Sequence, residues 1–460
     1  MGPTIRSISG FGPAPLPLVL EPTFPYGEDL LQFIWAEGLF ETHALRTTDR
    51  RTVEVVHPGR IQRNSGPDLH DARIRVDGQL WAGTVEVHAR SSEWNAHGHQ
   101  YDPAYDNVVL HVVHEHDAEV RTSRGRLLPT LELHARIDSA LLTSHARLMQ
   151  ERGFVPCAGA LGRIGAEHWT SWLDQLAVER MERRAQSLRS ELASLRGDLA
   201  SLFFHQLARA FGLKVNAEPF GMLANAVPLR VIHRVAADLF RTEAVLFGQA
   251  GLLQVDFVDA YPRGLQQEHH HIARSHGLRP APLASWKFGR MRPVNFPTIR
   301  IAQMAQVLVG CRGALLDLLN TGALMELRAL LEVTASDYWT DHFQFDRPAT
   351  PCPKRLGRSG ADHVIINAVV PVLFTMGRLH GDQRQVDKAM DLLRSLPAES
   401  NSVVAGWTSL GVKADRAVRG QALLELKDQY CTRRRCLNCA IGNHLLRASV
   451  KQVASSGPRI

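Results

Sequence analysis

The first part of the chain combines a helical hydrophobic pattern with several strand-like ones. Residues 28–41 place apolar side chains on one side at helical spacing, which predicts an amphipathic helix. The alternation typical of β-strands follows in three runs, at residues 51–57, 72–76 and 79–90. Asp77-Gly78 separates the last two runs and is typical of a hairpin turn. Residues 107–113 are apolar on both faces, which indicates a central strand.

The pattern becomes helical beyond about residue 140. Residues 178–202 are rich in Arg and Glu and predict one long amphipathic helix, and residues 419–430 predict a helix that leads into Cys431. We therefore expect an α+β protein with a mixed sheet followed by a mainly helical region. The predicted divisions are a disordered Pro-rich tail (1–25), an α/β domain (26–140), a helical domain (141–345) and a C-terminal helical region that ends in a cysteine cluster (346–460).

The composition is that of a globular protein. Of its 460 residues 45% are hydrophobic and 22% are charged, which excludes wholesale disorder and fibrous structure. No stretch approaches about 18 uninterrupted apolar residues, so we expect no membrane-spanning helix. The formal charge of +7 permits an anionic partner without requiring one. Six cysteines are too few for a disulfide scaffold, and the N-terminal segment does not resemble a secretory signal, so we expect a cytoplasmic protein.

Two acids and a histidine in the predicted hairpin form the most informative constellation. Side chains alternate between the faces of a strand, so Glu86 and His88 lie on the same face. Asp68 comes just before the partner strand, which allows its carboxylate to lie close to Glu86. Two carboxylates and a backbone carbonyl suit Mg²⁺ or Mn²⁺, and such an ion polarises a phosphoryl oxygen and activates water. The spacing therefore predicts a divalent-cation site for hydrolysis.

The order helix, strand, Pro-Asp, hairpin, Glu-x-basic and buried strand resembles the PD-(D/E)XK superfamily of restriction-endonuclease-like nucleases. The resemblance implies a sheet of that type, with Asp68 and Glu86 as metal ligands and His88 in the position of the lysine. Histidine does not copy a permanent positive charge, so His88 would act as a base or bind the metal itself, which favours Mn²⁺ or Zn²⁺. Some members add an acid from the first helix, for which Glu41, or Glu37 at the edge of the apolar arc, is the candidate.

Further histidines follow Glu86 closely. His111 lies in the middle of the predicted central strand, where its ring requires a partner, and it either faces the site or forms a hydrogen bond in the core. His97 and His99 flank Gly98 in a predicted loop and either support the metal ligands or are solvated.

Three cysteines near the C-terminus predict a second metal site, structural rather than catalytic. Cys436 and Cys439 have the spacing of a thiolate knuckle, and Cys431 supplies a third sulfur. The fourth ligand is either His444 or Cys352. Three cysteines with a histidine fit zinc, whereas four cysteines fit zinc or an iron–sulfur cluster. The alternative is a set of three reduced thiols near a helix end.

Several strings of residues together resemble one bacterial family, the domain-of-unknown-function 2851 family. They are 66–68 (GPD), 83–88 (GTVEVH), 105–113 (YDNVVLHVV), 292–297 (RPVNFP), 365–367 (IIN) and 436–442 (CLNCAIG). The resemblance extends from about residue 26 to 445 and implies a bacterial cytoplasmic protein. It brings no established activity.

The first functional hypothesis is a metal-dependent nuclease whose partner is DNA or another nucleic acid. One predicted helix has an arginine-rich face, formed by Arg180, Arg183, Arg184 and Arg189. This face would contact phosphates, or it is a solvated face whose arginines pair with the neighbouring Glu179, Glu182 and Glu191. The alternative is a non-catalytic module that binds nucleic acid or protein on a degenerate nuclease fold. A third hypothesis is a hydrolase that uses His88 and His111 around zinc on another substrate.

Overall fold

The computed structural model describes residues 24–62, 65–278, 286–321 and 323–455, with side chains described as far as residue 450. The chain forms two compact units. Unit 1 comprises Met1–Ala160 and Arg434–Ile460, and unit 2 comprises Leu161–Arg433. This division differs from the predicted consecutive domains because the C-terminal segment returns to the first unit. Apart from residues 24 and 25, the predicted tail lies outside the described residues.

Unit 1 is built on a mixed sheet, as the sequence predicts. The sheet order is β1-β3-β4-β5-β6, and β2 pairs with β3. The pairs that involve β1, β2 and β3 are antiparallel, whereas β4, β5 and β6 run parallel. The strands are β1 Val53–His57, β2 Arg60–Ile61, β3 Leu69–Val76, β4 Gln79–Arg90, β5 Val108–Glu115 and β6 Thr130–Glu132.

The predicted hairpin and central strand are confirmed. Asp77 (φ 48°) and Gly78 (φ 80°) connect β3 to β4, and two successive positive φ values are the signature of a type I′ turn. β5 lies between β4 and β6, and seven of its eight residues are buried. Its near-continuous apolar run therefore reflects burial on both faces of the sheet.

The first helix is shorter than predicted. α1 spans Glu28–Ala36 and ends because Gly38 adopts a left-handed conformation (φ 62°). The N–H of Gly38 donates to Trp35 O, and the N–H of Leu39 donates to Ile34 O, which is the bonding of a Schellman C-cap. Glu41 therefore lies beyond the helix in an exposed turn, not on its apolar arc.

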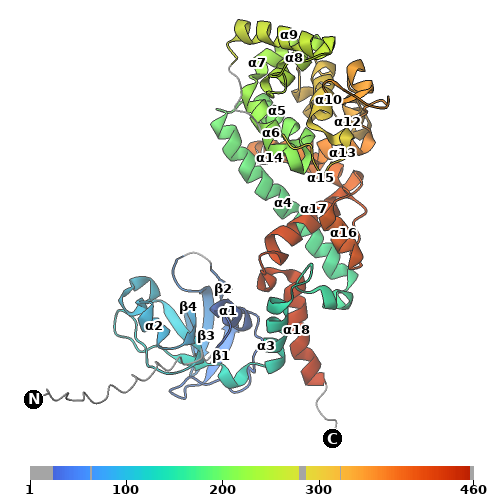
Figure 1. Ribbon diagram of the computed structural model, residues 1–460. Helices are drawn as coiled ribbons and strands as arrows, with labels where there is room; N and C mark the ends of the chain where they lie inside the picture. Colours follow the sequence, from blue (N-terminus) through green and yellow to red (C-terminus); the bar gives the residue numbers. More distant parts are fainter. Residues whose placement is uncertain (1–23, 63–64, 279–285, 322, 456–460) are drawn as a thin grey trace, which may run out of the picture. The chain divides into compact units, whose positions relative to one another are not determined.

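The core of unit 1 joins segments from both ends of the chain. Buried residues of α1 and the strands pack with α3 (Ser139–Gln150) and with Cys436 and Leu446 of the C-terminal segment. Figure 1 shows α18 (Ala440–Ser455, red) beside α3. The Arg434 guanidinium donates to the carbonyl oxygens of Leu148, Met149 and Glu151, so it caps the end of α3.

Short helical turns complete unit 1. They are α2 Glu93–Ala96, η1 His99–Tyr101, η2 Pro103–Tyr105, η3 His134–Arg136 and η9 Cys436–Asn438. The first three connect β4 to β5 and carry several side chains of the site described below.

Unit 2 is mainly helical, as expected. Its α-helices are α4 Ala166–Ser194, α5 Leu199–Phe211, α6 Leu213–Ala226, α7 Leu229–Val235, α8 Leu239–Gln249, α9 Ala260–His276, α10 Pro297–Gly310, α11 Leu316–Asn320, α12 Leu324–Leu331, α13 Arg358–Val364, α14 Val370–His380, α15 Gln383–Ser395, α16 Ser402–Ser409 and α17 Ala417–Glu425. It also contains 3₁₀ turns η5 Pro293–Asn295 and η6 Asp337–Thr340, the hairpin of β7 His342–Gln344 and β8 Arg347–Pro348, and π-helical turns η7 Ile365–Val369 and η8 Leu426–Cys431.

The helix predicted over residues 178–202 is in fact two helices. α4 ends at Ser194, since Arg196 (φ 54°) and Gly197 (φ 84°) leave the helical conformation. Asp198 is the N-cap of α5, and its side chain accepts a hydrogen bond from the N–H of Ser201. The sequence signal of this break is Gly197-Asp198, since Gly commonly ends a helix and Asp commonly caps the next one.

The arginine face of α4 bonds within unit 2. Arg180 and Arg183 both donate to the Glu425 carboxylate, which is 2% exposed, and Arg184 donates to the carbonyl oxygen of Asn367. Arg189 lies 3.9 Å from Glu182. Arg180, Arg183 and Arg184 therefore join α4 to other segments of unit 2, whereas Arg189 and Glu182 both belong to α4.

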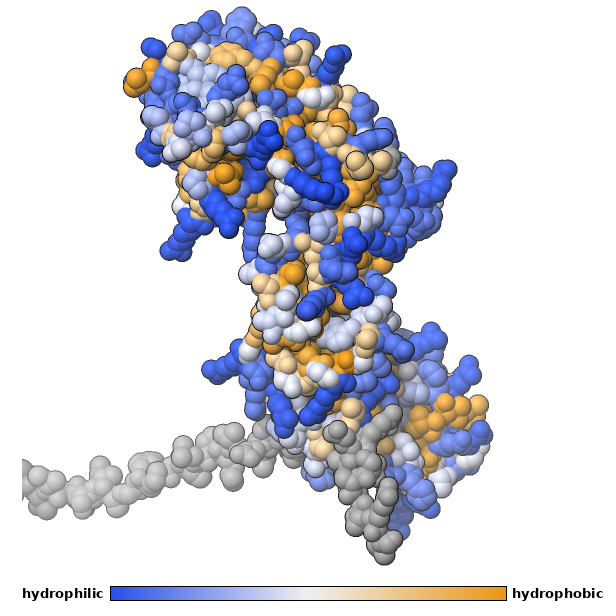
Figure 2. Space-filling view, turned by 90° about the vertical axis from the view of Figure 1, so that its right-hand side faces the viewer, coloured by the Kyte–Doolittle hydropathy of each residue, from blue (hydrophilic) through white to orange (hydrophobic). Residues whose placement is uncertain are grey.

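One continuous helical run, 358–380, is long and apolar enough to cross a membrane by length and composition. The apolar window of this run is 78% buried inside the protein, which is the setting of a core helix. On the face shown in Figure 2, hydrophobic residues of unit 2 are scattered among hydrophilic ones. The run is therefore weak evidence for a membrane span.

Candidate functional site

The site begins where β4 extends beyond its antiparallel neighbour. The pairing of β3 with β4 ends at Leu69 and Val85, so the following residues of β4 pair with β5 only. The Val87 N–H on the open edge donates to Asp68 Oδ2 at 3.1 Å. The backbone amide of Ala89 interacts with the carboxylate of Glu28, at the start of α1. Two carboxylates therefore replace the missing strand partner.

Glu86 connects these acids to a group of imidazoles. Its carboxylate is almost fully buried, and Oε2 accepts the Asp68 N–H at 3.0 Å. The other oxygen, Oε1, lies 3.3 Å from His99 Nε2 and 3.6 Å from His88 Nε2. The structure thus brings together the predicted residues Asp68, Glu86 and His88.

The carboxylates repel one another. Burial, followed by the charges of Glu93 and Glu86, raises the pKa of Glu28 to about 7. Burial, followed by the charge of Glu86, raises the pKa of Asp68 to about 7. Among the described residues, none of the principal influences on these two pKa values is a lysine or an arginine. The site therefore favours a cation or bound protons.

His88 lies within a row of imidazoles. His88 Nδ1 is 2.8 Å from His111 Nε2, and His88 Nε2 is 3.2 Å from His97 Nδ1. Burial lowers the pKa of His88 to about 2 and that of His111 to about 3, so both rings are neutral at physiological pH. A neutral imidazole offers a nitrogen lone pair to a metal ion, whereas it does not supply the positive charge of a lysine.

His97 and His99 belong to the same cluster. The α2–η1 segment turns at Gly98 (φ 79°), which places both rings beside His88. His99 also stacks on Tyr105 with the ring centroids 3.8 Å apart. Among the described residues, His88, His97 and His99 form a group whose ligand atoms all lie within 4.8 Å of one another. The sequence alone did not decide whether His97 and His99 support the metal ligands or are solvated.

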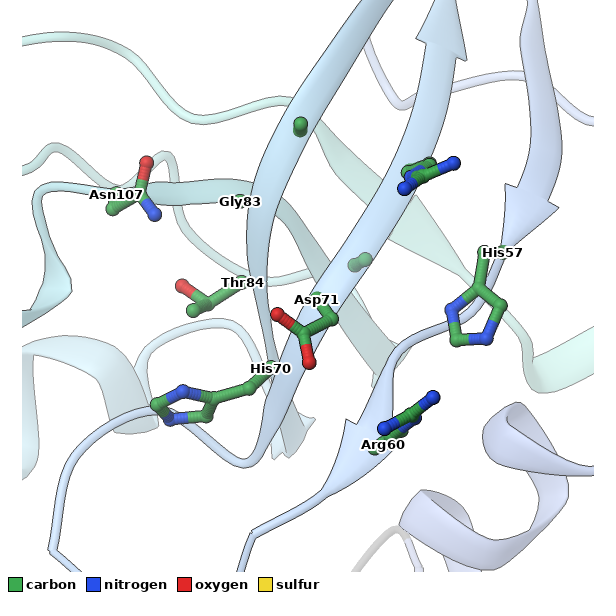
Figure 3. A pocket seen from close by; sticks show the side chains of 10 residues that line it. His57, Arg60, His70, Asp71, Gly83, Thr84 and Asn107 are labelled. Atoms are coloured by element: carbon green, nitrogen blue, oxygen red, sulfur yellow. The ribbon is translucent and has the colours of Figure 1, made fainter.

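A basic groove lies on the face of β4 that carries Glu86. Its lining includes Thr84, two residues before Glu86 on the strand. Its volume is about 640 Å³. Figure 3 shows His57 and Arg60 on one side, with His70, Thr84 and Asn107 on the other. The remaining lining residues are Asp71, Ala72, Arg73, Ala82 and Gly83. His70 Nε2 and Thr84 Oγ1 are buried without a hydrogen-bond partner in the described structure, so both remain able to bond a ligand.

Sequence reasoning missed Glu28 and assigned its role to Glu41. Glu41 is exposed, and its Oε1 accepts the N–H of His43 instead of entering the site. The sequence signal that could have identified Glu28 is the acidic first turn of α1. The structure shows that α1 contacts β4, and that the helix ends before it reaches Glu41. Glu37 is close to Arg447 and forms an ion pair with it.

The predicted cysteine ligands are divided between the units. Cys436 and Cys439 lie in unit 1 with His444, whereas Cys431 and Cys352 belong to unit 2, where Cys352 Sγ accepts a hydrogen bond from Lys354. Cys157, which sequence reasoning left out, packs against the same core cluster as Cys436. Burial, followed by the influence of Cys439 and Cys436, raises the pKa of Cys157 to about 12. Three thiols of unit 1 are therefore neighbours.

A family model described as "Protein of unknown function (DUF2851)" matches residues 28–402. The chain belongs to this family. The match begins at Glu28 and includes the carboxylates and imidazoles of this DUF2851 site, and it ends before Cys431. A search of curated proteins and a search of solved structures gave no match.

The Glu28→Gln variant is expected to stabilise the metal-free DUF2851 protein at pH 8. The folded-state pKa of Glu28 is about 7, above its ordinary value of 4.5, so its contribution to stability falls as the pH rises between these values. Glutamine cannot ionise, so it removes the cost of the Glu28 charge at pH 8. We expect the unfolding temperature in EDTA to rise by roughly 2–4 °C for each ~1 kcal/mol gained in the free energy of unfolding. At pH 5 the shift is expected to vanish.

Glu41→Gln is the matched control, because it removes the same charge from an exposed position of unit 1. An equal shift in both variants, or a larger shift at pH 5 than at pH 8, would contradict the proposed crowding of carboxylates around Glu28.

Proposed function

We propose that this protein is a metal-dependent nuclease that hydrolyses phosphodiester bonds at the open edge of β4. The observation that carries the proposal is the convergence of Glu28, Asp68 and Glu86 from three separate segments. Burial and neighbouring acids raise the pKa values of Glu28 and Asp68, which is costly for the fold alone and supports a functional reason for their proximity.

Asp68 and Glu86 would hold Mg²⁺ or Mn²⁺ through their carboxylate oxygens, in keeping with the preference of these ions for oxygen ligands. When bound, such an ion polarises the phosphoryl oxygen and lowers the pKa of a water molecule. Glu28, which faces the same edge, accepts a proton from the attacking water. His88 is neutral and buried, so it acts as a ligand or a support for Glu86 and not as a positive charge.

The basic groove supports a nucleic-acid substrate. Arg60 and Arg73 line it next to the site, and the unpartnered atoms of His70 and Thr84 suit phosphate oxygens. The arginine face of α4, by contrast, is occupied by bonds within unit 2. The groove is therefore the better candidate for contacts with the phosphate backbone.

We also propose that the thiols of unit 1 bind a structural metal, zinc or an iron–sulfur cluster. Cys157 joins Cys436 and Cys439 as a ligand because all three lie together. Burial raises the pKa values of Cys157 and Cys436, and a bound cation would offset this cost by stabilising the thiolates. Gly442 supports this loop, since a Cβ at this position would lie 2.1 Å from Cys436 O.

Asp68→Asn and Glu86→Gln are each expected to reduce cleavage of DNA or RNA by at least about 100-fold, since a metal ion contributes several kcal/mol to the transition state. Cleavage of labelled oligonucleotides in Mg²⁺ and in Mn²⁺ measures this loss, with the exposed Glu54→Gln as control. Unchanged cleavage in both variants would refute the proposal. Nucleic-acid binding without cleavage in any of these ions would identify a non-catalytic binding module.

The Arg60→Ala/Arg73→Ala variant is expected to weaken nucleic-acid binding and its dependence on salt. Each phosphate contact contributes about 0.7–0.9 to the slope of log K against log salt, so the slope should fall by about 1.4–1.8. Binding is measured in EDTA with the Glu86→Gln protein as parent. Arg75→Ala is the control, since Arg75 lies on the same strand but pairs with Glu54, and its slope should remain unchanged.

Cys157→Ser is expected to reduce the bound metal and lower the stability of unit 1, because it removes a ligand. Elemental analysis measures the metal, and a brown colour in the parent protein identifies an iron–sulfur cluster. Cys311→Ser, at a half-buried position of unit 2, is the control. Full metal content in the Cys157→Ser protein would remove this residue from the ligand set.

A further inference from the structure

We infer that His88, His97 and His99, together with Glu86, form a binding site for a transition-metal cation of the zinc class. This site lies on the imidazole side of Glu86, whereas the proposed catalytic carboxylates Glu28 and Asp68 lie on the other side. Binding of the ion follows from the imidazole geometry, and only its participation in hydrolysis rests on the proposed function.

The spacing of the donor atoms fits a small ion. A tetrahedral ion with bonds of about 2.0–2.1 Å keeps its ligand atoms roughly 3.3–3.4 Å apart. The corresponding distances are 3.2 Å from His97 Nδ1 to His88 Nε2, 3.6 Å from His88 Nε2 to Glu86 Oε1, and 3.3 Å from His99 Nε2 to Glu86 Oε1. These three distances match the edges of one coordination sphere, and the ligand atoms of His88, His97 and His99 all lie within 4.8 Å of one another.

The hydrogen-bonding state of the rings supports the same assignment. His99 Nε2 is buried, and it lacks a hydrogen bond in the described structure although Glu86 Oε1 is near. If His88 donates its Nδ1 proton to His111 Nε2, His88 Nε2 carries a lone pair that points toward His97. Three ring nitrogens lie close together and have few protons to share. Their lone pairs would therefore bind a cation more favourably than the rings can form hydrogen bonds with one another.

His111 fits the role of a positioning residue. Metal-bound histidines commonly donate their second ring nitrogen to a fixed acceptor, which sets the tautomer and the ring orientation. In the tautomer that leaves a lone pair on His88 Nε2, the acceptor for the His88 Nδ1 proton is His111 Nε2, 2.8 Å away. The far nitrogen of His111, Nδ1, is buried and has no partner in the described structure, so a proton passed along the row would have no exit. This argues against a proton relay.

The site is accessible at one corner. His97 is exposed, whereas His88 and Glu86 are buried and Trp94 and Tyr105 enclose His99. An ion can therefore enter beside His97. Imidazole donors suit zinc and neighbouring transition metals better than Mg²⁺, which prefers oxygen ligands and retains its waters.

Glu86 would then connect two cations. Oε1 faces the imidazoles, and Oε2 faces the backbone of Asp68. A carboxylate shared between neighbouring ions occurs in hydrolases that use two metals to stabilise the attacking and leaving oxygens. The inference therefore extends the proposed one-cation site to a mixed pair, with a zinc-class ion on one side and Mg²⁺ or Mn²⁺ on the other.

The test is a zinc titration of the full chain after removal of metals with EDTA. The His97→Ala/His99→Ala variant is expected to bind one equivalent of Zn²⁺ fewer than the parent, whereas Glu28→Gln/Asp68→Asn should bind as many. Because the cysteines are unchanged in all these proteins, the difference reports on the histidines alone. Co²⁺ is the spectroscopic probe, and we expect a four-coordinate visible band in the difference between the parent spectrum and that of the double histidine variant.

Controls separate ligand loss from misfolding. His270→Ala/His271→Ala removes two exposed histidines of α9 and should leave the zinc stoichiometry unchanged. His97→Ala alone alters an exposed side chain, so it should fold normally and weaken Zn²⁺ binding by more than about tenfold. His111→Asn should weaken it by about 10–100-fold, the usual effect of losing an outer partner.

Undiminished zinc binding in a folded His97→Ala/His99→Ala protein would overturn the inference. So would reduced cleavage in His97→Ala with full zinc affinity, because that result indicates a relay of protons. Zinc bound by the histidines without any cleavage would leave this inference standing and refute the nuclease. Cleavage that depends on Asp68 in a parent without histidine-bound zinc would refute this inference and leave the proposed nuclease standing.

Discussion

The edge of β4 beyond Val85 presents amide groups that have no strand partner, and a buried unpaired amide costs about 1–3 kcal/mol. Asp68 and Glu28 meet this requirement with carboxylates, which brings two acids to the strand that carries Glu86. The carboxylates that bond these backbone amides therefore bring an excess of negative charge to the edge of β4. His88 and His111, which are neutral because they are buried, leave that charge uncompensated. Most of the chemistry proposed for unit 1 follows from this one gap in strand pairing.

The sequence predicted those parts of the fold that are governed by local periodicity and turn chemistry. The boundaries of β4 and the Asp77-Gly78 turn agree with the structure because alternation and two positive φ values leave few alternatives. The end of α1 was wrong, since Gly38 interrupts a pattern whose apolar side chains continue beyond it. The return of residues 434–450 to unit 1 was not predictable, because that packing joins segments with no periodic relation.

The site was predictable in part for the same reason. Asp68, Glu86 and His88 share a hairpin, so strand geometry alone places them together. Glu28 and Cys157 reach their neighbours through tertiary packing, and His97 and His99 through an irregular turn at Gly98. Membership of the DUF2851 family adds no activity, so the functional argument depends on contacts and charges in unit 1.

The return of the C-terminal segment also has a consequence for biosynthesis. The core around α1 and the sheet includes Cys436 and Leu446, so unit 1 lacks part of its interior until residue 446 leaves the ribosome. The whole of Leu161–Arg433 is translated in between, which takes roughly 14–55 seconds at 5–20 residues per second. During that interval the nascent sheet exposes apolar surface that chaperones recognise, while unit 2 is free to fold first.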